Sequence, residues 1–152
     1  VRNVITKSCR IKLDFVNKDE KEKNRRMILN FGHTFAHGIE AANNYSRKIN
    51  HGEAVLIGMS FATKLSRQKK ICSLNTYNKI TNLYKKNNLP DNLKEYSLSK
   101  SINKIVNHMK SDKKNKDSRI NLILLKNIGK TTKPDTIKMT PKKVKIALDK
   151  II

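Results

Sequence analysis

The chain has 152 residues, enough for one domain with its own hydrophobic core, and it begins at Val1, so we expect a fragment or a processed chain. Its formal net charge of +22 comes from basic residues spread evenly along the sequence, without an RNA-binding aromatic motif or zinc-finger spacing, so we expect an anionic small substrate and no nucleic acid as partner. The longest apolar run, 54–63, is too short for a membrane span, and two cysteines without a signal peptide predict a cytoplasmic protein.

Residues 1–17 are predicted to form a helix, because apolar residues recur along one stripe at helical spacing. The stripe consists of Val1, Ile5, Cys9 and Val16. Lys12 falls on the same stripe, and the residues alone favour a lysine at the stripe's edge that keeps its ammonium group in water. In the charged connector 17–24 that follows, Asn17 or Asp19 is placed to cap the next helix.

Residues 26–42 are predicted to form one buried helix with an inverted distribution of polar groups. Its polar residues are spaced by four, three and four positions, so they share one face of a helix; they are Arg26, Asn30, His33 and His37. The other faces are apolar or small. Burying polar groups without partners costs roughly 2–7 kcal/mol, so this row should line a cavity. Two imidazoles beside an arginine and an amide favour a metal ion and an anionic ligand.

The rest of the chain is predicted to surround this helix. Helices are expected at about 51–70, 75–88 and 99–110, and a last one starts at Thr140 and Pro141, which match an N-cap and the first helical position. Residues 120–125 have the pattern of a buried strand, and 130–139 can return beside them. The prediction is therefore a single, mostly α domain over 1–152 with one small β-hairpin near 119–137.

The histidines carry the strongest chemical signal. His33 and His37 form an HxxxH pair, which can hold Zn²⁺, although the HExxH protease motif is absent because Thr34 follows His33. His51, at the expected start of a helix, can fold back toward this pair. A catalytic zinc needs three protein ligands and an open position, and the spacing alone leaves open which histidines are ligands. His108 is expected to be structural or exposed.

The motifs together resemble one family. NFGHTFAHGIE at 30–40, HGEAV at 51–55 and Gly58-Met59 closely resemble the C-terminal half of the 3-dehydroquinate synthase family. The likeness extends to Lys12, to DEKEKNRR at 19–26, to Asp112-Lys113-Lys114 and to INLILLKNIGK at 120–130. The resemblance implies the largely helical, metal-binding C-terminal domain of the dehydroquinate synthase-like fold, with the N-terminal NAD domain absent from this chain and the active site between the two.

The resemblance alone also implies a role for each matching residue. Two zinc or cobalt ligands of the family fall on His33 and His51, and the third, a glutamate, is expected upstream of Val1. His37 matches the catalytic histidine and Glu22 a proton acceptor. The positions that hold the substrate match Lys12, Arg26, Asn30 and one residue of the pair Lys113 and Lys114, so the resemblance makes Lys12 a substrate ligand.

The implied reaction converts 3-deoxy-D-arabino-heptulosonate 7-phosphate to 3-dehydroquinate and phosphate, a carbon–oxygen lyase step of the shikimate pathway toward chorismate and the aromatic amino acids. NAD would be recycled within the reaction. The implied partners are an anionic sugar-acid phosphate, an N-terminal NAD domain and a second copy in a homodimer, and this chain alone is expected to be inactive. Two alternatives stay open: another NAD- and metal-dependent sugar-phosphate cyclase of the superfamily, and an inactive basic helical binding module.

Overall fold

The computed structural model describes residues 1–111 and 119–152, and its helices confirm the predicted mostly α class. Lys113 and Lys114 lie outside the described residues. In chain order the helices are α1 (Arg2–Lys18), the 3₁₀ helix η1 (Arg25–Asn30), α2 (His33–Ala42), α3 (His51–Gln68), α4 (Leu74–Lys86), the 3₁₀ helix η2 (Ser99–Ser101), α5 (Ile102–Lys110) and α6 (Pro141–Asp149). No helix of the described part is long and apolar enough to cross a membrane.

The predicted hairpin is confirmed and consists of two short antiparallel pairs. Strand β1 (Ile120–Asn121) pairs with β4 (Lys138–Met139), and β2 (Leu125–Asn127) pairs with β3 (Lys130–Thr131). Between the two pairs, the Leu122 N–H donates to the Ile137 carbonyl oxygen and the Thr132 N–H donates to that of Leu124. The hairpin therefore continues through its irregular middle.

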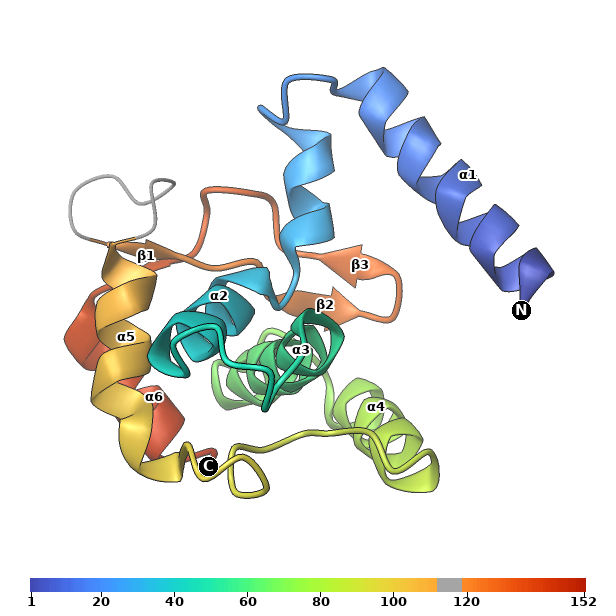
Figure 1. Cartoon of the computed structure of the whole chain (residues 1–152). Coiled ribbons are helices and arrows are strands. Elements are labelled where there is room, and N and C mark those ends of the chain that lie inside the picture. Colours follow the sequence, from blue (N-terminus) through green and yellow to red (C-terminus); the bar gives the residue numbers. More distant parts are fainter. Residues whose placement is uncertain (112–118) are drawn as a thin grey trace.

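The hydrophobic core lies where α2 packs against α3 and α5, with α6 closing against α5 (Figure 1). Phe35 of α2 and Phe61 of α3 meet edge to face, with ring centroids 6.1 Å apart, and both are fully buried. The N-cap expected at the start of α6 is present, and α3 has a cap that was not singled out in the sequence. Thr140 accepts from the Lys143 N–H at the start of α6, and Asn50 forms a reciprocal capping box with Glu53 at the start of α3.

The prediction of one continuous helix over 26–42 is wrong. The 3₁₀ helix η1 ends at Asn30, Gly32 has a left-handed φ of +83°, and α2 begins at His33. A side chain on Gly32 would lie 2.6 Å from the Met59 Cγ atom, and one on Gly58 would overlap the Gly32 carbonyl oxygen. The chain turns here because α3 passes directly over it. Arg26 and Asn30 therefore do not share a helical face with the histidines.

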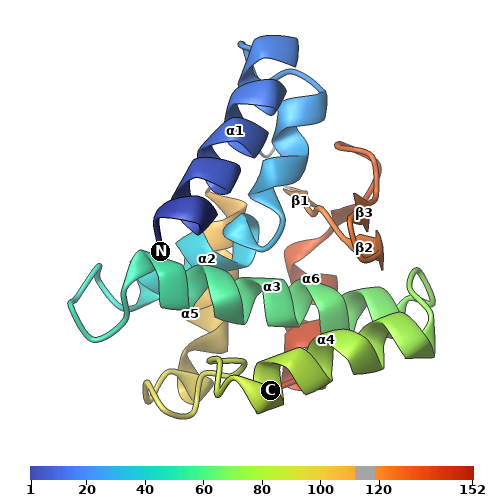
Figure 2. The ribbon, with the colours of Figure 1, turned by 90° about the vertical axis from the view of Figure 1, so that its right-hand side faces the viewer.

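Helix α1 is confirmed, but its apolar stripe does not join the core. It runs beside η1 and away from the other helices (Figures 1 and 2), and no residue of α1, described over its full length, is buried. Val4 and Ile5 remain 68% and 57% exposed. The guanidinium of Arg25 stacks on the Phe15 ring at 5.0 Å and ties α1 to the start of η1.

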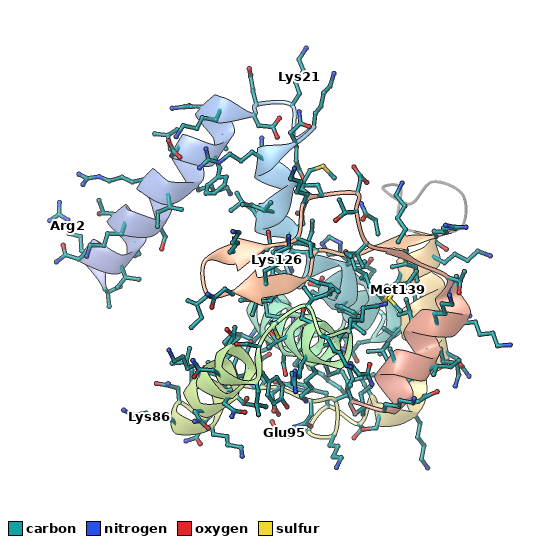
Figure 3. The ribbon with its side chains drawn as sticks, turned by 180° about the vertical axis from the view of Figure 1, so that it is seen from behind. Arg2, Lys21, Lys86, Glu95, Lys126 and Met139 are labelled. Atoms are coloured by element: carbon teal, nitrogen blue, oxygen red, sulfur yellow. The ribbon has the colours of Figure 1, made fainter. Side chains whose placement is uncertain are left out.

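Basic side chains of the described residues lie in separate parts of the molecule, as expected from the sequence. Arg2 on α1, Lys86 at the end of α4 and Lys126 on β2 are exposed and lie in three separate parts of the molecule (Figure 3). This pattern gives a diffuse field and no single basic face made of these residues.

The contact at Gly58 predicts the sign of a substitution. Helix propensity alone would make Gly58→Ala stabilising by up to about 1 kcal/mol, because Gly58 lies inside α3. The overlap with the Gly32 carbonyl should reverse that sign and lower the free energy of unfolding by roughly 1–3 kcal/mol. Urea unfolding followed by circular dichroism measures this. Asn82→Ala, at an exposed position inside α4, is the control and should be neutral or slightly stabilising.

Candidate functional site

A cleft of about 480 Å³ between α1 and η1 brings together most of the polar residues singled out in the sequence. Its lining is Ser8, Ile11, Lys12, Glu22, Arg26, Leu29, Asn30 and His33. Three residues of the polar row expected on one helix line the cleft from two elements, Arg26 and Asn30 from η1 and His33 from α2. Lys12 of α1 and Glu22 of the connector join them there. Lys12 reaches the cleft because the stripe on which it lies is exposed rather than buried.

Glu22 lines this cleft and is held by its polar neighbours. The Asn30 Nδ2 donates to the Glu22 Oε1 at 2.6 Å, and the Arg26 Nε lies 4.0 Å from the Oε2. The backbone of Glu22 has a φ of +51°, which is uncommon for a residue with a side chain. The connector therefore turns sharply at Glu22, and its carboxylate accepts from a group of η1.

Asp19 fixes the shape of the connector. Its carboxylate accepts from the backbone N–H groups of Lys23, Asn24 and Arg26, at 2.9, 2.8 and 3.0 Å. These hydrogen bonds, that from Arg26 first, lower the pKa of Asp19 below its ordinary value. The Arg26 Nη1 also donates to the Glu20 carbonyl oxygen at 2.9 Å. Of the two caps that the sequence offered, Asp19 is the one that binds the start of η1.

Three histidines form a triangle, and one of them, His33, also lines the cleft. The ring centroid of His33 lies 5.9 Å from that of His37 and 5.6 Å from that of His51, and the latter two are 6.4 Å apart. Helix α2 supplies the first two residues, and the first turn of α3 supplies the third. His51 therefore folds back toward the pair, as predicted, because α3 packs against α2.

Two of these imidazoles have an acceptor beside the Nδ1 atom. The His51 Nδ1 lies 3.0 Å from the Glu40 Oε1, and the His33 Nδ1 lies 3.4 Å from the Phe31 carbonyl oxygen. An acceptor at Nδ1 favours the tautomer with its proton there and leaves the Nε2 lone pair for a metal ion. Two such imidazole nitrogens fit part of the donor set of a zinc or cobalt ion, which takes a further protein ligand. Within residues 1–111 and 119–152, no group of three His, Cys, Asp or Glu side chains is arranged to hold one.

Other sequence expectations have plain outcomes. His108 is exposed on α5, as expected. Glu40 was not singled out, although it lies seven residues after His33 and three after His37 on α2 and thus shares their face. That spacing was the signal that could have found it, whereas its contact with His51 depends on the packing of α3.

Comparison with known proteins identifies the family. Residues 1–115 match the profile of the family described as 3-dehydroquinate synthase C-terminal. The chain belongs to this family. It is 43% identical over 129 residues to a 3-dehydroquinate synthase of Pelagibacter ubique and 45% identical over 130 residues to one of Endomicrobium trichonymphae. These alignments cover 85% and 84% of this chain but 35% and 34% of the relatives, so the chain spans about a third of their length.

Two solved structures share the fold. A 2-deoxy-scyllo-inosose synthase, complexed with carbaglucose-6-phosphate, NAD⁺ and Co²⁺, superimposes with a TM-score of 0.68 at 23% identity. A second structure of a 2-deoxy-scyllo-inosose synthase gives a TM-score of 0.64 at 22% identity. Each comparison covers 86% of this chain, and 35% and 34% of those chains. The helical arrangement is therefore that of the dehydroquinate synthase-like fold.

The lowered pKa of Asp19 predicts how stability depends on pH. Because the pKa is lower in the folded state than in the unfolded state, the stabilisation is present above the unfolded pKa of about 3.9 and is lost as the pH falls through the folded pKa. The melting temperature should therefore fall less below pH 4 in Asp19→Ala than in the wild type. Thermal melts by circular dichroism between pH 7 and 3 measure this.

The control for this prediction is Asn17→Ala, since Asn17 was the other possible cap and carries no charge. This variant should keep the pH dependence of the wild type. An equal loss of stability on acidification in the wild type and in Asp19→Ala would mean that the three backbone hydrogen bonds do not depend on the ionised carboxylate.

Proposed function

We propose that this chain is the helical, metal-holding part of a 3-dehydroquinate synthase, which converts 3-deoxy-D-arabino-heptulosonate 7-phosphate to 3-dehydroquinate and phosphate. The observation that carries the proposal is the cleft in which Lys12, Glu22, Arg26 and Asn30 meet His33. The two relatives named above, at 43% and 45% identity, support the choice of reaction. The NAD domain is expected in the part of the relatives that this chain does not span.

The cationic wall of the cleft suits an acidic phosphorylated substrate. Arg26 offers a planar guanidinium that can pair with two oxygens of a carboxylate or phosphate, and Lys12 offers a compact positive charge. Asn30 can donate to a substrate hydroxyl through its amide. The net charge of +22 would draw such an anion toward the site. Lys113 or Lys114 completes this set in the proposal, on the ground of the family resemblance.

The metal ion, Zn²⁺ or Co²⁺, is held in this proposal by the Nε2 atoms of His33 and His51, with a glutamate outside this chain as the third ligand. When bound, the metal ion polarises the substrate hydroxyl and NAD provides reversible oxidation. The 2-deoxy-scyllo-inosose synthase of the same fold, complexed with NAD⁺ and Co²⁺, supports both cofactors.

Two residues of the chain would handle protons. His37 is exposed one helical turn beyond His33 and can face the substrate rather than the metal ion. Glu22 would accept a proton, a role that rests on the family resemblance, and its carboxylate lies in the cleft, where it accepts a hydrogen bond from Asn30. The substrate would lose phosphate after its transient oxidation, be reduced again, open, and close by an aldol step. The resident side chains would hold it and exclude water through these steps.

One other enzyme activity has a specific observation in its favour, because both solved structures of this fold compared above are 2-deoxy-scyllo-inosose synthases. A cyclase for a sugar phosphate that has no carboxylate would keep the histidines and would not need a site for that group. Two cationic residues in one cleft, Lys12 and Arg26, favour a substrate that carries a carboxylate besides its phosphate. Assaying the assembled enzyme with both substrates separates the two. The homodimer expected from the resemblance and the inactivity of this chain alone stay predictions.

The proposal separates the roles of the two histidines on α2. In the assembled enzyme, in which this chain is joined to an NAD domain, His33→Ala should lose both metal and activity. His37→Ala should keep the metal and lose rate by roughly 10²–10⁴-fold, the usual contribution of general acid–base catalysis. Metal content by atomic emission, measured beside kcat, gives the two readouts.

His108→Ala, at the exposed fourth histidine, is the control and should change neither metal content nor rate. If His37→Ala loses the metal as His33→Ala does, the HxxxH pair is a metal clamp and the proposed division of roles is wrong.

A further inference from the structure

We propose that Glu40 is a positioning residue for the metal site: its carboxylate accepts the N–H at the Nδ1 of His51 and so presents the Nε2 of that ring to the metal ion. This role rests on the proposed function, in which His51 is a metal ligand. It adds to that site a carboxylate that touches neither metal nor substrate.

The geometry is specific to this pair. The Glu40 Oε1 lies 3.0 Å from the His51 Nδ1, across the loop that joins α2 to α3. The Glu40 side chain is only 15% exposed, whereas that of His51 is 58% exposed. The packing of α2 on α3 therefore holds the carboxylate in place, and the carboxylate in turn holds a ring that is otherwise open to solvent.

The physical reason lies in the two tautomers of a neutral imidazole. A ring free in water can carry its proton on either nitrogen, and only the tautomer with the proton on Nδ1 has a lone pair on Nε2. A carboxylate at Nδ1 selects that tautomer, fixes the ring plane and makes Nε2 a stronger base toward a metal ion. For His33 the Phe31 carbonyl oxygen, 3.4 Å from Nδ1, provides a weaker version of the same arrangement.

A second carboxylate near His51 shows what a structural role looks like. Glu53 lies in the same first turn of α3, but its Oε2 accepts from the Asn50 backbone N–H at 2.8 Å, and its own N–H donates to the Asn50 Oδ1 at 2.9 Å. These hydrogen bonds cap α3 and do not involve the imidazole of His51. Glu53 is therefore a matched control for Glu40, because Glu40 contacts the imidazole of His51 and Glu53 contacts the backbone of the same helix start.

The first test reads the tautomer without any metal. In the full 152-residue chain at pH about 8.5, about two units above the ordinary pKa of imidazole, ¹⁵N NMR should show the proton of His51 on Nδ1. Glu40→Ala should shift His51 toward the tautomer with the proton on Nε2. Glu40→Gln should retain the Nδ1 proton, because the amide oxygen still accepts. Glu53→Ala should lower the melting temperature and leave the tautomer unchanged. The same tautomer in the wild type and in Glu40→Ala would overturn the proposal.

The second test measures Zn²⁺ affinity by competition with a chelator in the assembled enzyme. Glu40→Ala should bind Zn²⁺ about 10–100-fold more weakly, the usual effect of losing such a partner, with Glu40→Gln between it and the wild type. Glu53→Ala should bind as the wild type does. Equal affinity in Glu40→Ala and the wild type would overturn the role of Glu40 and leave the metal site standing. Zn²⁺ binding that is unaffected by both His33→Ala and His51→Ala would instead overturn the metal site itself.

Discussion

The contact between Gly32 and Gly58 is the constraint on which the rest of this structure depends. Gly32 adopts a left-handed backbone, and Gly58 has no side chain, so α3 can pass directly over the point where η1 gives way to α2. The same contact sets the distance between α2 and α3. It thereby brings His51, at the start of α3, within 5.6 Å of the His33 ring. A side chain at either glycine would separate the parts of the site.

The break at Gly32 also separates two sets of polar residues, those of η1 that line the cleft and the histidines of α2. The segment before it, with Arg26 and Asn30, lies beside α1 and forms the cleft. The segment after it carries the histidines. Asp19 organises the connector that leads into the first segment, and Glu40 contacts the histidine supplied by α3. The chain has 34 basic and only 12 acidic residues, and these two of its carboxylates each accept hydrogen bonds that shape the site.

Much of the fold could be predicted from periodicity and caps. The helix at 1–17, the one that starts at Pro141 and the hairpin near 119–137 were all expected, because local pattern determines them. The break at Gly32 could not be, since an isolated glycine within a helical pattern costs only about 1 kcal/mol and does not by itself end a helix. What ends it is α3, which is remote in sequence.

The site shows the same limit. The residue types predicted its chemistry, and Lys12, Arg26, Asn30 and His33 do meet in one cleft, although they lie on different elements and not on one helical face. The sequence did not show that the apolar stripe of α1 lies outside the core. An apolar stripe indicates that one face of a helix can be buried, but it does not indicate which element buries it. The role of Glu40 needed the packing of α2 on α3, which spacing does not contain.

The most direct test of the account is a crystal structure of the assembled enzyme with Co²⁺, in which anomalous scattering locates the ion. The account predicts the ion on the Nε2 atoms of His33 and His51, with the Glu40 carboxylate still on the Nδ1 of His51 and His37 off the metal. An ion bound by His33 and His37, or bound through the Nδ1 of His51, would contradict it.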